Sequence, residues 1–335
     1  MNLGESKYSQ FALVKEMFAT ADVVKSMDPA LFSAYSRPQA KVLLSGEGSS
    51  RIFPAKNLLA AALEQGYPQF IYTENSLQSR EYQLDDYSVF VASNSGKTAE
   101  AVRLIQHLRS SCSAQVTAVC AHADTPIMNA ADETYLLQCG PEEAVAATKS
   151  VVEQALFYDM LFRYYNGAEM PDLRSLADSI QQVLAANVPQ PVLEALYPAR
   201  SIYFAGRNNG VAEELRLKTN EITRRKSDYL EGTYTVHGIE EVMQPDEVVV
   251  VIEPFPEEQK KFKEVLEQGV GMKVVAIAAR ETEFPTFIIP AHSGFDGYVQ
   301  LAAGWNLLVE LGIRSGVNVD KPARARKVGN EYAVE

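Results

Sequence analysis

The sequence has 335 residues and a formal net charge of −12, and 47% of its residues are apolar while 22% are charged. This is the composition of a water-soluble globular chain that is long enough for two domains with separate cores. The acidic balance, without any block of Lys and Arg, argues against a nucleic-acid partner. No apolar run approaches the roughly 18 residues of a membrane span, and the amino terminus lacks the apolar segment of a signal peptide. We therefore expect a cytoplasmic protein with no membrane partner.

The cysteines and histidines show none of the spacings typical of metal sites. The four histidines form no HxH or HxxxH pattern, and the three cysteines form no CxxC pattern. The cysteines lie in or beside apolar runs: Cys112, Cys120 and Cys139. We expect these thiols to be reduced, and we expect no metal ion and no cofactor.

Strands and helices alternate along the first half of the chain. A helical segment over residues 1–38 precedes a series of apolar strands, each followed by a loop of small residues and then by a helical pattern. The predicted strands are 40–44, 88–92, 114–120 and 134–138, and the predicted helices are 56–63, 99–109 and 144–165. Alternation of this kind predicts an α/β fold with a doubly wound parallel sheet between two layers of helices.

The second half of the chain repeats this pattern. RSIYFAGRNNG resembles KVLLSGEGSS, EVVVVIEPF resembles SVFVASNSG, and KVVAIAARETEFP resembles VTAVCAHADTPI, in the same order and at similar spacing. The duplication predicts two tandem domains of the same fold. We divide the chain into a helical segment (1–38), a first domain (39–168), a helical linker with proline breaks (169–197) and a second domain (198–335).

The loop SNSGKT, residues 93–98, lies between a predicted strand and a predicted helix. Free backbone N–H groups and the positive end of a helix bind anions in such a place, and hydroxyl groups add further donors. The loop is not a nucleotide-binding P-loop, because Val91 stands where that motif requires glycine. A serine-rich helix cap is the alternative interpretation, but it explains one hydroxyl better than three. The loop therefore predicts a phosphate site, and the proline-containing loop 253–256 of the second half predicts none.

A charged stripe is predicted on the helix over residues 211–225. Glu214, Lys218 and Glu221 are spaced i, i+4 and i+7, so two carboxylates flank one ammonium on a single face. A solvent-exposed set of ion pairs is the common explanation of such spacing. Apolar neighbours such as Leu215 and Ile222 favour a partly enclosed stripe, where acids and bases are tuned.

In their order and spacing these motifs resemble the SIS (sugar isomerase) family, in particular the isomerase domain of glucosamine-6-phosphate synthases and stand-alone SIS-type deaminases. The resemblance implies that Glu221 moves a proton between C1 and C2 of a sugar phosphate and that His237 opens the sugar ring. It also implies that Lys218 and Glu214 orient and charge-balance these groups. In the family the histidine reaches in from a neighbouring subunit, so we expect a homodimer.

The resemblance extends to the groups that hold the substrate. The carboxyl-terminal NVDKPARARK segment is similar to the family's closing tail and places Lys327 as the lysine that contacts the open-chain carbonyl and can form an imine with a ketose. Positions matching the phosphate and sugar contacts are Ser50, Ser93, Asn94, Ser95, Thr98, Val145 and Ala147. Two of them differ from the synthase, which carries glutamine at the place of Asn94 and serine at the place of Ala147.

Several reactions suit such a site. No amino-terminal cysteine nucleophile and no glutaminase domain is evident, so the sequence favours deamination of glucosamine 6-phosphate to fructose 6-phosphate and ammonia. An aldose–ketose isomerase of sugar phosphates and an Amadori deglycase acting on fructosamine 6-phosphate are the alternative enzymes. A phosphosugar-sensing regulatory module is the non-enzyme alternative, and it does not require the Glu, His and Lys set.

Overall fold

The computed structural model describes residues 1–333 and divides into two compact units, each built on one five-stranded parallel sheet. The first-sheet unit comprises residues 22–142 and 147–173 together with the tail from Arg326 onward. The second-sheet unit comprises residues 1–21, 143–146 and 174–325. The units are therefore interleaved along the sequence, whereas the predicted domains follow one another.

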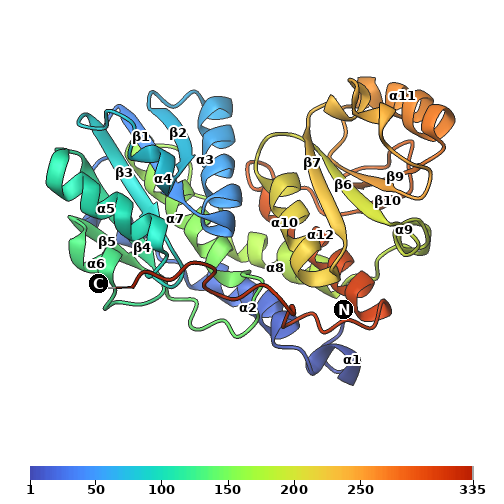
Figure 1. The fold of residues 1–335 in the computed structure, drawn as a ribbon, viewed down its shortest axis with the longest axis horizontal. Coiled ribbons are helices and arrows are strands. Elements are labelled where there is room, and N and C mark those ends of the chain that lie inside the picture. The colour runs from blue at the N-terminus through green and yellow to red at the C-terminus, as the bar shows by residue number, and fades with distance from the viewer. Residues whose placement is uncertain (334–335) are drawn as a thin grey trace. The chain divides into compact units, whose positions relative to one another are not determined.

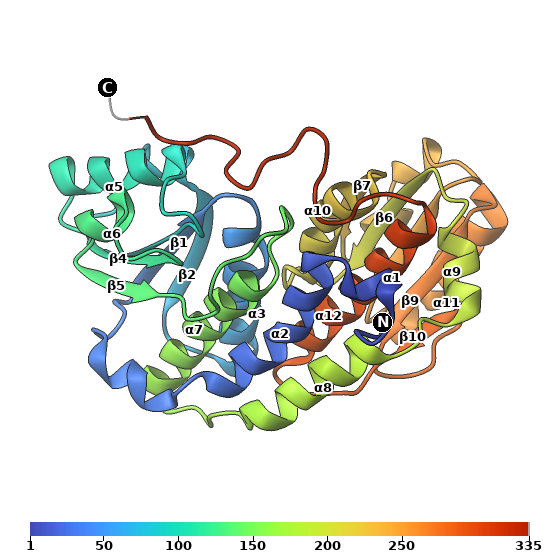
Figure 2. The same ribbon diagram turned by 90° about the horizontal axis from the view of Figure 1, so that it is seen from below.

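The first sheet has the strand order β2-β1-β3-β4-β5, with every neighbouring pair parallel. Helices α3 and α7 pack together on one face, and α5 contacts both α4 and α6 on the other (Figure 1 and Figure 2). The elements are β1 (Lys41–Gly46), α3 (Ile52–Gln65), β2 (Phe70–Asn75), α4 (Ser76–Ser79), β3 (Tyr87–Ala92), α5 (Ala99–Ser111), β4 (Gln115–Cys120), α6 (Pro126–Ala130), β5 (Glu133–Leu136) and α7 (Lys149–Asn166). The predicted three-layer arrangement is confirmed for this sheet.

The second sheet has the order β10-β9-β8-β6-β7, again with all neighbours parallel. Helix α10 packs on α12 on one face, and Phe262 and Leu266 close the core on the other. The elements are β6 (Ser201–Gly206), α10 (Val211–Thr223), β7 (Lys226–Glu231), β8 (Val248–Ile252), α11 (Gln259–Phe262), η6 (Lys263–Val270), β9 (Lys273–Ala278), β10 (Thr286–Ile288) and α12 (Asp296–Arg314).

The two sheets share one topology. In each, the first strand in the chain lies between the second and the third, and the fourth and fifth follow outward. This common order supports the internal duplication inferred from the sequence. The remaining elements are α1 (Ser6–Ser9), α2 (Ala12–Ser26), α8 (Leu173–Ala185), α9 (Gln190–Leu196) and short turns of helix η1 (Pro29–Ala34), η2 (Gly48–Ser50), η3 (Tyr234–Val236), η4 (Ile239–Glu241) and η5 (Pro256–Glu258).

Helix α5 shows how the sequence forms the layers. Thr98 has extended backbone angles and ends the preceding loop, and Glu100 places a negative charge in the first turn, where the helix dipole favours it. Val102, Ile105 and Leu108 follow at intervals of three residues and are buried against the sheet. The helix therefore begins directly after the loop that follows β3.

Two predictions of secondary structure need correction. The helix predicted over 144–165 begins only at Lys149, because the preceding residues form an irregular segment held by side-chain contacts. Strand β2 was not predicted, since FIYTEN lacks both a continuous apolar run and a strict alternation. The three cysteines are all free thiols, and no helix within residues 1–333 is long and apolar enough to cross a membrane.

Candidate active site

Helix α10 carries the predicted stripe of alternating charge. The Lys218 ammonium lies 2.9 Å from a carboxylate oxygen of Glu221 and 3.3 Å from one of Glu214. The side chains of Glu214 and Lys218 are almost completely buried, whereas that of Glu221 is 19% exposed. Solvent therefore reaches the carboxylate of Glu221, and Glu221 is the residue expected to move a proton.

Helix α10, which carries the buried stripe, packs closely on α12. A Cβ added to Gly304 of α12 would lie 2.3 Å from a methyl group of Leu215, and one added to Gly312 would lie 3.1 Å from the carbonyl oxygen of Ile222. Glycine at these positions allows the backbones of α10 and α12 to approach each other closely. The apolar neighbours of the stripe fill the helix interface, as the sequence indicated, and the charged groups are enclosed with them.

The charges of the stripe compensate one another. Burial alone lowers the pKa of Lys218, but the carboxylates of Glu221 and Glu214 outweigh it and hold the pKa of Lys218 above its ordinary value. Lys218 therefore stays an ammonium at neutral pH. In this arrangement it pairs with both carboxylates and is positioned to orient Glu221 rather than to accept a proton itself.

His237 lies further along the sequence than this stripe and shares no hydrogen bond or ion pair with it among the described residues. It follows η3 after strand β7, it is exposed, and within residues 1–333 its ring makes no hydrogen bond or ion pair. Two large apolar side chains nearby in sequence are also exposed, Tyr234 at 63% and Val242 at 64%. The structure therefore does not join His237 to Glu221 within the second-sheet unit.

The loop after β3 is ordered by its own hydroxyl groups. The Ser93 hydroxyl lies 2.9 Å from that of Thr98 and accepts a hydrogen bond from the Gly96 N–H, and the Ser95 hydroxyl accepts one from the Lys97 N–H. Gly96 has a positive φ of 66°, and a Cβ there would lie 2.3 Å from the hydroxyl oxygen of Thr125. The loop thus requires glycine and presents hydroxyl groups directly before helix α5.

The loop that contains Ser50 begins beside it. Gly46 at the end of β1 pairs in register with Ala92 at the end of β3, so the two loops leave adjacent strands at the same edge of the sheet. A Cβ at Gly46 would lie 2.8 Å from the carbonyl oxygen of Ala92, which explains the glycine. The register brings the predicted phosphate contacts of both loops to one edge of the first sheet.

Glu142 was not predicted as a site residue, yet it joins several that were. Its buried carboxylate accepts hydrogen bonds from the Asn94 amide at 3.1 Å, the Ser150 hydroxyl at 2.7 Å and the Thr148 N–H at 2.8 Å. The Lys327 ammonium lies 3.3 Å from the same carboxylate. Asn94 therefore directs its amide group to Glu142 and links the loop to the start of α7. No local pattern marks Glu142, because Asn94 and Lys327 come from distant segments of the chain.

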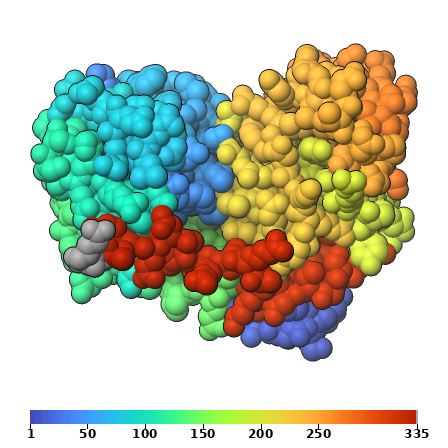
Figure 3. Space-filling view, in the orientation of Figure 1, coloured from blue at the N-terminus to red at the C-terminus, as the bar shows by residue number. Residues whose placement is uncertain are grey.

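The tail beyond Lys327 lies along the loop after β3. The Ala99 N–H donates to the carbonyl oxygen of Asn330, and the Tyr332 N–H donates to that of Lys97. Thr98 and Glu331 form an isolated antiparallel bridge. Figure 3 shows the end of the tail, in red, on the surface of this unit. The tail therefore places Lys327 and the hydroxyl-rich loop in the same part of the first-sheet unit.

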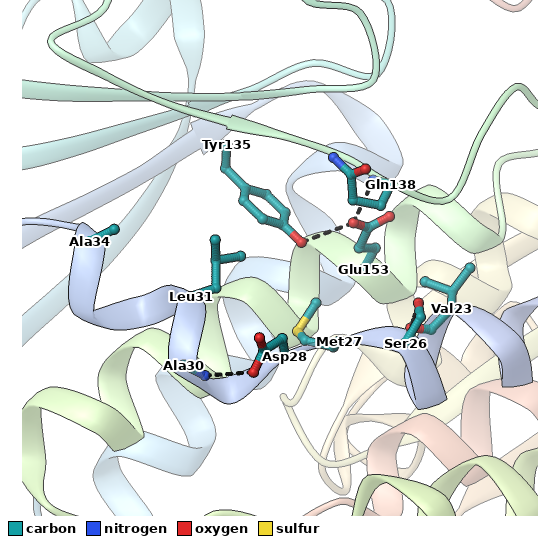
Figure 4. Close-up of a pocket in the computed structure, with 10 residues that line it drawn as sticks. All are labelled: Val23, Ser26, Met27, Asp28, Ala30, Leu31, Ala34, Tyr135, Gln138 and Glu153. Atoms are coloured by element: carbon teal, nitrogen blue, oxygen red, sulfur yellow. Dashed lines mark hydrogen bonds between the residues drawn. The ribbon is translucent and has the colours of Figure 1, made fainter.

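Glu153 of α7 fixes the segment that leads to Glu142. One of its oxygens accepts from the Tyr135 hydroxyl at 2.9 Å and from the Gln138 N–H at 2.7 Å, and the other accepts from the Cys139 N–H at 2.7 Å. Figure 4 shows Tyr135 and Gln138 converging on this carboxylate beside a hollow of about 380 Å³. Because these contacts satisfy the carboxylate, Glu153 has a structural role.

The segment 143–148 holds the predicted sugar contacts. The Val145 N–H donates to the carbonyl oxygen of Asp320, whose carboxylate accepts from the backbone N–H groups of Ala12 and Leu13. Asp320 thus ties the base of the tail to α2 and to Val145 in the second-sheet unit. Ala147 belongs to the first-sheet unit, just before the first turn of α7.

The second sheet has no comparable loop at the equivalent strand end. There the Arg207 guanidinium stacks on Phe255 and donates to the carbonyl oxygen of Glu253, and the Glu253 carboxylate pairs with Arg280. The remaining space beside Gly206 is only about 10 Å³. Protein side chains therefore occupy this position.

The two parallel five-stranded sheets share one topology, the first carries a hydroxyl-rich loop at a strand end, and the second carries a helix with a buried charged stripe. Together they define an α/β protein with a candidate anion-binding loop and a candidate acid–base site. A family model described as SIS domain matches residues 37–164. This part of the chain is therefore an SIS domain.

Curated relatives are similar to this chain beyond the SIS domain. The chain is 27% identical over 228 residues to a glutamine–fructose-6-phosphate aminotransferase (isomerizing) of Corynebacterium glutamicum, a match that covers 64% of this chain and 36% of that relative. The chain therefore spans well under two thirds of the length of such relatives.

Two solved structures show the same fold. A tagatose-6-phosphate ketose/aldose isomerase from Escherichia coli superposes with a TM-score of 0.78 at 17% identity, covering 95% of this chain and 98% of the other. A glucosamine-6-phosphate deaminase from Thermotoga maritima gives 0.76 at 16% identity, covering 96% and 99%.

Proposed function

We propose that this protein is a phosphosugar deaminase that converts glucosamine 6-phosphate to fructose 6-phosphate and ammonia. The observation that carries the proposal is the buried stripe of α10, in which Lys218 lies between Glu214 and the partly exposed Glu221. Buried charged groups cost desolvation energy and are enriched where chemistry uses them, so the stripe favours an enzyme over a binding module.

In the proposed reaction, Glu221 removes the proton from C2 of the open-chain amino sugar and returns it to C1, which leaves an imine at C2. One water molecule then adds to this carbon, its oxygen becomes the ketose carbonyl, and the nitrogen leaves as ammonia. Lys218 keeps Glu221 oriented and supports its charged form. The hydroxyl groups and backbone N–H groups of the loop 93–98, together with Ser50, bind the phosphate. Lys327 contacts the carbonyl at C2.

His237 is the proposed ring-opening group. Its exposed position, between the exposed Tyr234 and Val242, supports a role in the site of a second subunit of a homodimer. A closed two-fold arrangement would then give each site one histidine from the partner chain.

A panel of sugar phosphates tests the proposal. Purified protein is incubated with glucosamine 6-phosphate, with an aldose phosphate lacking nitrogen and with fructosamine 6-phosphate carrying an amino acid, and both ammonia and ketose phosphate are measured. Ammonia and fructose 6-phosphate in equal amounts from the first substrate support deamination. Interconversion of the nitrogen-free aldose and its ketose alone identifies an isomerase, and release of an amino acid identifies a deglycase. Binding without turnover of any of the three identifies a sensing module.

A further inference from the structure

Glu142 connects three segments that are distant in the sequence. Asn94 comes from the loop after β3, Ser150 and Thr148 come from the start of α7, and Lys327 comes from the tail. The side chain of Glu142 is 0% exposed, while that of Lys327 is 29% exposed. A buried carboxylate thus holds a lysine whose side chain still reaches solvent.

We propose that Glu142 is a positioning residue that holds Lys327 in place for the C2 carbonyl of a ketose phosphate and stabilises the cationic imine formed there. The inference rests on the proposed function, in which Lys327 reacts with the open-chain carbonyl. It assigns to Glu142 a role that none of the predicted site residues fills.

The atom balance of imine formation gives the physical reason. The Lys327 nitrogen bonds to C2 of the ketose, and the carbonyl oxygen leaves as water with two of the three ammonium hydrogens. One hydrogen stays on nitrogen, so an ammonium and a neutral ketone become a protonated imine and water. The positive charge is therefore retained on nitrogen, and the Glu142 carboxylate can pair with it before and after the step.

The other contacts of Glu142 keep this carboxylate fixed and ionised. Burial raises the pKa of Glu142, but the Lys327 ammonium and the hydrogen bonds from Ser150 and Thr148 outweigh burial and hold it below its usual range. Asn94 binds the same carboxylate, so the hydroxyl-rich loop and the lysine are held at one point. A phosphate seated on that loop thus places its sugar within the part of the unit that also holds Lys327.

The test separates imine formation from phosphate binding. Wild type and Glu142→Gln are saturated with fructose 6-phosphate, treated with borohydride, which delivers a hydride to the imine carbon, and digested for mass spectrometry of the Lys327 peptide. Affinity for sorbitol 6-phosphate, which has the phosphate but no carbonyl, is measured by calorimetry. We expect the trapped adduct to fall about tenfold or more in Glu142→Gln, because a charge-assisted contact is lost, while sorbitol 6-phosphate affinity changes less than about threefold.

Glu143→Gln is the matched control, because it removes an adjacent carboxylate that is exposed. It should trap as much adduct as wild type. Turnover provides a further readout: Glu142→Gln should lower kcat with little change in KM, since the lost interaction acts on the reacting nitrogen. An adduct yield in Glu142→Gln equal to that of Glu143→Gln overturns the inference. A parallel loss of sorbitol 6-phosphate binding also overturns it, because Glu142 would then merely support the loop.

The binding of sorbitol 6-phosphate by wild type separates failure of this inference from failure of the proposed function. If wild type binds sorbitol 6-phosphate but yields no adduct on Lys327, the inference fails and phosphate recognition stands; if wild type does not bind it, the proposed function fails as well. If Glu142→Gln does not fold, Glu142→Asp replaces it, since the shorter side chain keeps the charge but withdraws it from Lys327. Reduced adduct in Glu142→Asp supports the inference, and a wild-type yield contradicts it.

Discussion

The Lys218 ammonium lies 2.9 Å from the Glu221 carboxylate on the same face of α10, one turn of helix apart. With Glu214 at 3.3 Å on the other side, the ammonium is enclosed by two negative groups in the interior of the second-sheet unit. Because the side chains of Lys218 and Glu214 are almost completely shielded from water, the charge of each depends on the neighbouring charges for its stability.

Replacing Lys218 by methionine should therefore destabilise the protein strongly. The substitution keeps the apolar stem but leaves two carboxylates close together without the positive charge between them, and breaking a buried pair typically costs about 3 to 5 kcal/mol. Denaturant unfolding followed by circular dichroism measures the loss. Lys226→Met, at an exposed lysine, is the control. A loss of unfolding free energy below about 1 kcal/mol for Lys218→Met would show that the charges of the stripe are not energetically coupled.

Glu221→Gln should abolish turnover and leave ligand binding intact. The amide has the same shape and can still accept the hydrogen bond from Lys218, but it cannot carry a proton, and a general base contributes about 10² to 10⁴ in rate. Steady-state kinetics should show at least a hundredfold fall in kcat, with unchanged affinity for sorbitol 6-phosphate. If more than about a tenth of wild-type kcat remains, equivalent to a loss under about 1.4 kcal/mol, Glu221 is not the proton carrier.

The double variant Ser95→Ala, Thr98→Val should raise KM for the phosphorylated sugar. These substitutions remove two hydroxyl groups from the loop before α5, where an anion is bound by hydroxyl and backbone donors. KM should rise about tenfold or more for the phosphorylated sugar, with a smaller change for the same sugar without phosphate. Equal losses on both compounds would show that the hydroxyl groups only order the loop.

Acid should remove the stabilising contribution of Glu142. Because the folded-state pKa of Glu142 is lowered, its contribution is fully present above the ordinary glutamate pKa of about 4.3 and is lost as pH falls through the lower folded-state value. The difference in unfolding free energy between wild type and Glu142→Gln should therefore be constant above about pH 5.5 and shrink below about pH 4.3. A difference that stays level or grows on acidification would contradict the ion-paired state.

Mixing two inactive variants tests whether His237 acts in the neighbouring subunit. If each site takes Glu221 from one chain and His237 from the other, a hybrid of Glu221→Gln and His237→Ala subunits contains one site with both substitutions and one with neither. Random re-pairing makes about half of the dimers hybrid, so activity should recover to roughly a quarter of wild type.

The control for that experiment mixes Glu221→Gln with a chain carrying both substitutions, a combination in which no site is intact. Subunit exchange is verified by mass on differently tagged chains. Exchange without recovery would place His237 in its own chain's site.

Local periodicity in the sequence was enough to predict features that depend on neighbouring residues of one helix, strand or loop. The spacing of Glu214, Lys218 and Glu221 fixes one helix face whatever surrounds it, and the structure confirms their pairing. The loop 93–98 was located in the same way, since strand, small polar residues and helix follow one another directly. The expected roles of His237 and Lys327 came from resemblance, and their chemistry is still a prediction.

The tertiary structure decided what depends on segments far apart in the chain. The close approach of α12 to Leu215 of α10 depends on Gly304, and no pattern in α10 itself encodes it. The interleaving of the two units and the bridge between Thr98 and Glu331 also depend on segments that are far apart in the sequence. Glu142 resembles the exposed Glu143 beside it in sequence, and only folding brings Asn94 and Lys327 to its carboxylate, because hydrogen bonds form between neighbours in space.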